Sequence, residues 1–151
     1  MVMTSFNTID GIPASTNHHL MRDILRGELG FDGVLISDFA AIKETIAHGY
    51  SENGEKAAEN ALRAGVDIDM MTTTYLDHVA DLIQKGVLKE ELLDESVMRI
   101  LELKNRLGLF ENPYKDADEE KEKDKVAHQT FAGNTGRRLI NVLAASRKIQ
   151  S

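Results

Sequence analysis

The chain has 151 residues, of which 42% are hydrophobic and 28% are charged, a balance typical of a globular domain. Its net charge of −7 argues against nucleic acid as a partner, because phosphate binding requires clustered Lys and Arg. The absence of cysteine excludes disulfides and thiolate metal sites, and no apolar run reaches the roughly 20 residues that span a bilayer. The N-terminal residues lack the basic start and long apolar stretch of a signal peptide, so the sequence leaves the compartment open.

Three short apolar runs predict β-strands, at Val2–Phe6, Val34–Ser37 and Val66–Met71. They begin at residues 2, 34 and 66, a constant interval of 32 residues. The runs are continuously apolar rather than alternating, as expected for strands that helices cover.

Helical patterns fill the intervals between these strands. Asn17 is a suitable N-cap for a helix that Gly30 ends. Four more segments are predicted to be helical: Ala40–His48, Glu55–Ala64, Thr74–Lys85 and Lys89–Leu107. The alternation predicts an α/β fold of about three βα units with parallel strands. Because a closed (β/α)8 barrel takes about 250 residues, the chain is predicted to be either a partial barrel or a small complete α/β domain.

The composition changes after residue 114. Residues 115–125 contain ten charged residues and one alanine, so we expect a solvated, charged linker. Residues 126–151 have apolar residues that fit one side of a C-terminal helix, although the stretch 130–136 is rich in small and polar residues that weaken it.

Asp38 is the central candidate for chemistry. The second predicted strand ends at the pair Ser37-Asp38, and active sites of parallel α/β folds lie beyond the carboxyl ends of strands. An ionised Asp in this place can attack an anomeric carbon as a nucleophile. Position and residue type alone favour another role, in which Ser37 or Asp38 caps the following helix.

Two further groups of residues have alternative interpretations. Asp67 and Asp69 are two positions apart in a predicted strand, so we expect them on one face. One of them is a candidate acid partner for Asp38, and the alternative is pairing with backbone donors or arginines. His18 and His19 are adjacent and do not share a helix face, so we expect solvated histidines and no metal site.

Several motifs follow one another in a characteristic order. They are the run from Met3 to Asn17, the pair Leu25-Arg26, the run from Gly30 to Phe39 with its Ser-Asp pair, the run from Ala64 to Met70, and the later pieces 99–104, 107–110 and 112–114. Together they closely resemble glycoside hydrolase family 3, in its β-glucosidase and β-xylosidase branch. The resemblance covers about residues 1–114.

The resemblance implies that residues 1–114 are the C-terminal portion of a (β/α)8 TIM-type barrel domain, about strands six to eight of it. Residues 126–151 would begin the following α/β sandwich domain or form a divergent end. Asp38 would be the nucleophile in the retaining hydrolysis of terminal β-D-glucosides or β-D-xylosides, through a covalent glycosyl-enzyme intermediate. Met3, Phe6 and Phe39 match positions beside the sugar, although Tyr is common in place of Phe6 and Trp in place of Phe39. Core packing is the alternative for Met3 and Phe6.

The resemblance also implies what the chain lacks. The family takes its general acid/base, usually a Glu, from the sandwich domain, and its other sugar-binding residues from the first five barrel strands. We therefore expect the chain alone to be inactive, with the missing barrel half as a partner and a glucoside or oligosaccharide as the parent enzyme's substrate. We expect no cofactor and no metal. The family motif at Asp67 and Asp69 is not an acid/base site, which favours the pairing interpretation. Many relatives are periplasmic or secreted.

Two hypotheses compete with the hydrolase interpretation. The chain would be a non-catalytic module that binds carbohydrate or complements another half-barrel, since a three-stranded sheet has open edges. Alternatively, it would be an unrelated small α/β domain in which Asp38 caps a helix.

Overall fold

A computed structural model describes residues 1–114 of the chain. The chain separates into two compact units, Met1–Leu107 and Gly108–Ser151. The linker predicted at 115–125 and the helix predicted within 126–151 lie outside the described residues. In the second unit, the described residues form a turn in which the Asn112 amide donates to the Gly108 carbonyl at 3.0 Å.

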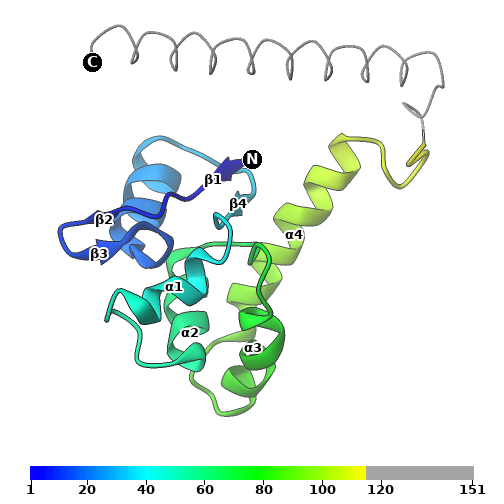
Figure 1. The fold of residues 1–151 in the computed structure, drawn as a ribbon. Coiled ribbons are helices and arrows are strands. Elements are labelled where there is room, and N and C mark those ends of the chain that lie inside the picture. The colour runs from blue at the N-terminus through cyan, green and yellow to red at the C-terminus, as the bar shows by residue number, and fades with distance from the viewer. Residues whose placement is uncertain (115–151) are drawn as a thin grey trace, which may run out of the picture. The chain divides into compact units, whose positions relative to one another are not determined.

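The first unit has a mixed α/β architecture with very short strands (Figure 1). β1 (Val2–Met3) pairs in parallel with β4 (Leu35–Ile36). The third predicted strand contributes one parallel bridge, between Ile36 and Ile68. The parallel pairing is therefore confirmed, but the predicted strand lengths are wrong. β1 pairs only with β4 among the described strands. The third predicted strand is joined to β4 by backbone bonds from the Ser37 amide to the Ile68 carbonyl and from the Asp67 and Ile68 amides to the Leu35 carbonyl. The side chains of Asp67 and Ser37 add bonds to the Leu35 and Met70 amides.

A β-hairpin between β1 and the first helix was not predicted. β2 (Thr8–Ile9) pairs antiparallel with β3 (Ile12–Pro13). The two connecting residues, Asp10 and Gly11, both have positive φ, 53° and 79°. Asp-Gly is the residue pair that such two-residue turns prefer, so the signal for the hairpin was present in the sequence.

All five helices predicted within residues 1–114 are present, with ends that shift by one or two residues. The helical elements are η1 (Ala14–Thr16), η2 (His19–Glu28), α1 (Ala41–Ala47), α2 (Gly54–Ala64), α3 (Thr74–Gln84) and α4 (Glu90–Arg106). The predicted role of Asn17 is confirmed, because its Oδ1 accepts the Leu20 amide at 3.0 Å. η2 is a π-helix rather than an α-helix, with the Leu29 amide reaching back to the Ile24 carbonyl.

The core consists of two apolar clusters that share α2. This helix packs against both α1 and α3, which lie next to it in Figure 1. Ala57 and Ala61 belong to the first cluster, and Ala58 and Leu62 to the second. Small residues let the neighbouring elements approach α2 closely. The other buried members are Ala14, Met21, Leu35, Ile42 and Val66 in the first cluster and Val79, Leu82 and Leu88 in the second.

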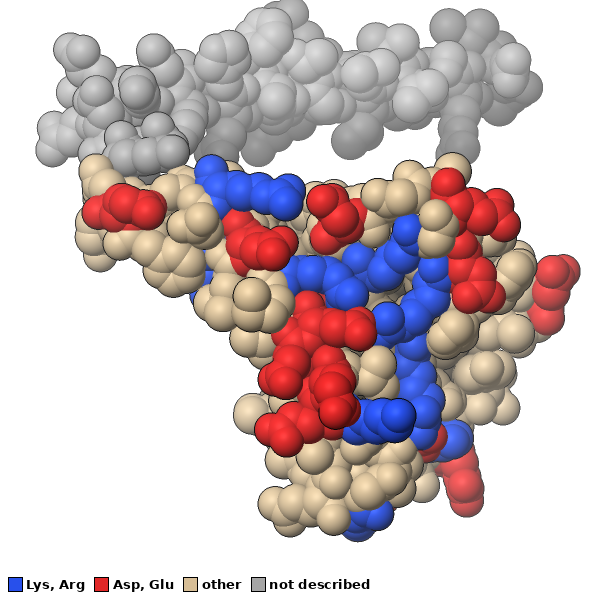
Figure 2. Space-filling model, turned by 180° about the vertical axis from the view of Figure 1, so that it is seen from behind, with Lys and Arg blue, Asp and Glu red and all other residues tan. Residues whose placement is uncertain are grey.

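The charged side chains are mixed in sign on the face shown in Figure 2. A band of Lys and Arg lies there between groups of Asp and Glu. The ion pairs of the described residues include Arg22 and Arg99 with Glu95, each at 3.0 Å, and Arg63 with Glu59 at 3.0 Å. Within residues 1–114, no helix has the length and apolar character that crossing a membrane requires.

Candidate active site

Asp38 lies directly after β4, in the turn that leads into α1. The residue before it, Ser37, is fully buried, whereas Asp38 is half-buried and Phe39 is 58% exposed. The chain thus passes from the core to the surface over these three residues. This is the carboxyl end of a parallel strand, where active sites of α/β folds form.

Residues 68–70 form hydrogen bonds to both ends of this turn. The Ser37 amide donates to the Ile68 carbonyl at 2.9 Å, and the Ser37 hydroxyl accepts the Met70 amide at 2.8 Å. At the other end, the Ala40 amide donates to the Met70 carbonyl at 2.9 Å. Asp38 therefore sits between two residues that are fixed to the same neighbouring segment.

Neither Ser37 nor Asp38 caps α1, so the helix-cap interpretation is wrong. The residue at the N-cap position is Ala40, which has a left-handed φ of 57° and no side-chain cap. The Ser37 hydroxyl accepts the Met70 amide instead, and Asp38 Oδ1 accepts the adjacent Phe39 amide at 2.7 Å. Asp38 Oδ2 has no hydrogen-bond partner among the described residues.

Asp67 is a buried structural anion. Its side chain is 0% exposed, and Oδ2 accepts the Leu35 amide at 2.8 Å and Arg26 Nη2 at 2.9 Å, while Oδ1 accepts Arg99 Nη1 at 2.9 Å. Burial lowers the pKa of Arg26, while Asp67 raises it. The expected pairing with backbone donors and arginines is confirmed for Asp67, which joins β4, η2 and α4.

Asp69 fixes the start of α3. Its Oδ2 accepts the Thr74 amide at 2.9 Å, and both of its carboxylate oxygens contact the Thr72 hydroxyl. The expected pairing with backbone donors is therefore confirmed for Asp69 as well. Since the oxygens of Asp67 and Asp69 are occupied by other partners, the structure gives neither the free carboxyl group that an acid partner of Asp38 would need.

The other predicted site residues are exposed. Met3 is 49% exposed, Phe6 is 41% exposed, and Phe39 follows Asp38 at the surface. None of the three belongs to an apolar core cluster. Core packing therefore does not describe Met3 or Phe6 in this chain.

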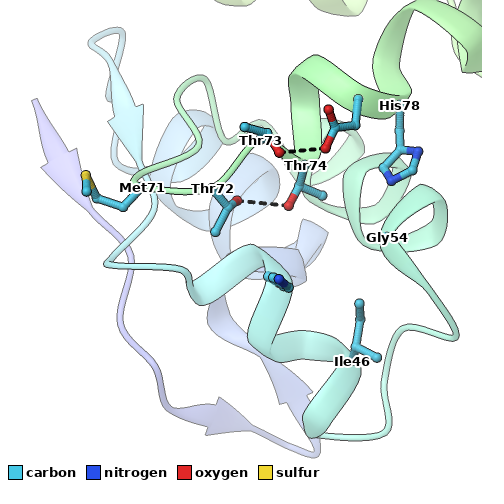
Figure 3. A pocket seen from close by; sticks show the side chains of 9 residues that line it. Ile46, Gly54, Met71, Thr72, Thr73, Thr74 and His78 are labelled. Carbon is cyan, nitrogen blue, oxygen red and sulfur yellow. Dashed lines mark hydrogen bonds between the residues drawn. The ribbon is translucent and has the colours of Figure 1, made fainter.

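A pocket of about 410 Å³ lies beside α1 and the start of α3 (Figure 3). Thr72 and Thr74 point toward one another in it, at 2.9 Å between their hydroxyl oxygens, and His78 lies against Gly54. Asp38 is not among its lining residues. The complete lining is Lys43, Ile46, Gly54, Met71, Thr72, Thr73, Thr74, Asp77 and His78.

The two adjacent histidines are solvated, as predicted. His18 and His19 are 60% and 73% exposed, and each has an Nδ1 near the Asp23 carboxylate, at 3.7 and 2.9 Å. This arrangement is a surface contact at the start of η2.

The sequence did not reveal the contact between Ser37 and Met70. The two residues are 33 positions apart, so no local pattern joins them. The only signal was the constant 32-residue interval between predicted strands, which places Ser37 and Asp69 at equivalent positions of neighbouring units.

Comparison with known proteins identifies the family. The sequence model of the glycosyl hydrolase family 3 N terminal domain matches residues 1–103. The chain belongs to glycosyl hydrolase family 3. The suggested resemblance is thereby confirmed, and the interpretation as an unrelated small α/β domain is wrong.

Named members of glycosyl hydrolase family 3 are similar to this chain. A periplasmic beta-glucosidase of Salmonella typhimurium is 40% identical over 113 residues, which are 75% of this chain and 15% of that protein. A beta-xylosidase of Formosa agariphila is 35% identical over 152 residues, covering 94% of this chain and 21% of that protein.

Solved structures extend the similarity to the fold. A beta-glucosidase from Listeria innocua in complex with glucose is 57% identical, with a TM-score of 0.75, over 76% of this chain and 16% of that protein. An aspartate-to-alanine mutant of the same enzyme, 56% identical to this chain, is in complex with laminaribiose. The chain thus spans about 15% of the length of the first of these relatives.

Proposed function

We propose that the chain is the nucleophile-bearing part of a retaining glycoside hydrolase that cleaves terminal β-D-glucosides or β-D-xylosides. The observation that carries this proposal is the place of Asp38 at the carboxyl end of β4, with Oδ2 free of partners among the described residues. The family and the names of the similar proteins support the class of substrate.

In the proposed reaction, Asp38 Oδ2 attacks the anomeric carbon and forms a glycosyl ester. The bond from that carbon to the leaving oxygen breaks, and a carboxylic acid gives this oxygen a proton. Water then attacks the same anomeric carbon, the carboxylate left by the acid group takes a proton from the water, and the bond to Asp38 breaks to release its carboxylate. Net retention follows from the two displacements, which require carboxyl groups about 5–5.5 Å apart.

The acid/base group is proposed to come from outside the described residues. Asp67 is bound to Arg26 and Arg99, and Asp69 is bound to the start of α3. We infer that this chain contributes the nucleophile and that another part of the intact enzyme contributes the acid.

The exposed apolar side chains are proposed to contact the substrate. Phe39, next to the proposed nucleophile, would offer an aromatic ring to a sugar. Met3 ends β1, which pairs with β4, and Phe6 lies three residues further on. Residues 1–114 are proposed to be the C-terminal portion of a TIM-type barrel, in which the outer edge of β1 would meet a strand of the other half. Residues 115–125 and 126–151 are proposed as the linker and the segment that follows it.

A graft tests the proposed nucleophile. Residues 1–114 would replace the matching segment of the Listeria innocua beta-glucosidase, and hydrolysis of an aryl β-glucoside would be measured. We expect an active graft whose kcat falls by at least about 1,000-fold in Asp38→Asn. Asp32→Asn, at a carboxylate that is 81% exposed, is the matched control and should keep the activity of the graft.

A mechanism-based label gives a second readout. A 2-deoxy-2-fluoro glucosyl fluoride should accumulate as an ester on the peptide that contains Asp38, and mass spectrometry would locate it. A label on any other side chain, or an active graft that is unaffected by Asp38→Asn, would overturn the proposal.

A further inference from the structure

Met70 holds the Asp38 turn at two points through its backbone. Its amide donates to the Ser37 hydroxyl at 2.8 Å, and its carbonyl accepts the Ala40 amide at 2.9 Å. We call these two hydrogen bonds the Met70 clamp. Only Asp38 and Phe39 lie between the two fixed residues, so the clamp restricts the path of the chain at the candidate nucleophile.

Backbone strain surrounds the clamp. Ala40 and Met71 have positive φ values of 57° and 63°, and they are two of the three non-glycine residues with this conformation within residues 1–114. The left-handed region is unfavourable for a residue with a Cβ and persists where the surrounding structure enforces it. One strained residue ends the Asp38 turn, and the other follows Met70 directly.

Ser37 is the side-chain component of the clamp. It is 0% exposed, so its hydroxyl is separated from solvent and from any substrate. Without that oxygen the half-buried Met70 amide would lose its acceptor within the protein, which weakens its attachment to β4. The Met70 segment would then be free to move relative to β4, and the turn would lose one of its two fixed points.

We propose that Ser37 is a positioning residue for Asp38, which acts by fixing the turn through the Met70 backbone. This inference rests on the proposed role of Asp38 as the nucleophile. A nucleophile must be held in line with the bond that it attacks, and small displacements lower the rate steeply. Ser37 would therefore affect the chemical step more than the binding of substrate.

The graft in the Listeria innocua beta-glucosidase provides the kinetic test. We expect Ser37→Ala to lower kcat by about 10- to 100-fold while KM stays within about twofold. The rate of labelling by the fluorosugar should fall in parallel. Ser96→Ala is the matched control, because Ser96 is also a buried serine, 2% exposed, whose hydroxyl donates to a backbone carbonyl, that of Leu92. It should leave both values unchanged.

Hydrogen exchange of the full 151-residue chain gives an independent test that needs no activity. The Met70 and Ala40 amides should be protected in the wild-type chain, and Ser37→Ala should accelerate exchange at both while the Leu35 amide stays protected. Rapid exchange of the Met70 amide in the wild-type chain would overturn the clamp, even if the variant failed to fold.

The outcomes separate the two proposals. An active Asp38→Asn graft would remove the proposed function, and with it this inference. An inactive Asp38→Asn graft, together with a Ser37→Ala graft as fast as Ser96→Ala, would remove the positioning role alone.

Discussion

The aspartates near the strand ends differ in what their oxygens contact. Asp67 is fully buried and shared between two arginines and a backbone amide, whereas Asp38 receives one hydrogen bond, from the residue next to it. A buried anion with several donors fixes the structure around it. A half-buried carboxylate with a free oxygen can meet a substrate, which is why we assign different roles to two chemically identical groups.

Asp67 should be important for stability. Asp67→Asn keeps the shape of the side chain but removes the charge between Arg26 and Arg99, which are only 10% and 17% exposed. Breaking a buried ion pair from one side leaves an uncompensated charge, so we expect a loss of about 3 kcal/mol in the free energy of unfolding of the full chain. Urea denaturation measures this loss.

The exposed variant Asp32→Asn is the control for this experiment. Asp32 is 81% exposed and 3.7 Å from Arg106. Surface substitutions of this kind usually change stability by less than about 0.5 kcal/mol. Equal losses in the two variants would contradict a special role for Asp67.

Glu95 should contribute to the pH dependence of stability. The hydrogen bond from Arg22 is the main cause that lowers the pKa of Glu95 below 4.5, and the contact with Arg99 adds to it. As the pH falls below about 4.5, the unfolded chain takes up this proton first, so stability is lost until the folded form is protonated too. Glu95→Gln should therefore lose less stability between about pH 6 and about pH 3.5 than the wild type.

The control for the pH experiment lies on the same helix. Glu91 is exposed, and within the described residues it has no ion pair. Glu91→Gln should keep the wild-type loss of stability between the two pH values. If Glu95→Gln also kept it, Glu95 would have no part in the acid sensitivity.

At the scale of elements, α2 connects the two halves of the core. It supplies buried residues to both apolar clusters, and its start is fixed by Asn53, whose Oδ1 accepts the Lys56 amide at 2.9 Å. Gly65, with a φ of 91°, ends the helix in the left-handed conformation. Both ends of α2 are therefore set by residues next to the helix, Asn53 and Gly65, rather than by tertiary contacts.

Removing this cap should weaken the whole first unit. We expect Asn53→Ala to lower the free energy of unfolding by about 1 kcal/mol, because the first turn of α2 loses an acceptor. Lys89→Ala is the matched control, since Lys89 occupies the N-cap position of α4 without a side-chain cap. A similar loss in both variants, measured by thermal or urea unfolding, would show that the Asn53 hydrogen bond contributes little.

At the scale of the whole molecule, the sheet remains open among the described residues. β1 pairs only with β4 there, and its residues Val2 and Met3 are both exposed. An apolar strand with an unpaired edge favours association with another strand. We therefore expect the proposed other barrel half to pair at this edge.

Co-expression tests this association. The part of the Listeria innocua beta-glucosidase that precedes the matching segment should co-purify with the 151-residue chain. Met3→Lys should weaken the association, because a charged side chain at the strand edge opposes pairing. Lys89→Ala, far along the sequence on the surface, is the control and should have no effect. Failure of the two pieces to co-purify would contradict the proposed partner.

The 151-residue chain alone should show negligible hydrolysis of an aryl β-glucoside. Positioned acid/base groups contribute about 10²- to 10⁴-fold to such reactions, and Asp67 and Asp69 are both held by other partners. Steady-state release of the aryl alcohol measures this activity. Robust turnover that disappears in Asp38→Asn would show that the acid lies within this chain.

Local patterns in the sequence determined the helices, the parallel direction of the strands and the position of Asp38 after a strand. These features depend on residue spacing, on caps such as Asn17 and Asn53, and on glycines such as Gly65, all of which act within a few residues. The Asp10-Gly11 turn was equally local, and the hairpin was missed because its signal was not used. The ordered motifs also indicated the family.

Only the tertiary structure decided the roles of the polar residues. Asp38 and Asp67 have the same carboxylate group, and their roles, like that of the Ser37 hydroxyl, depend on partners that the fold brings close. Ser37 meets Met70 across 33 positions, and Asp67 meets Arg26 and Arg99 across 41 and 32 positions. Because such contacts arise from packing rather than from local spacing, the sequence pointed to the position of the candidate nucleophile but not to what holds it in place.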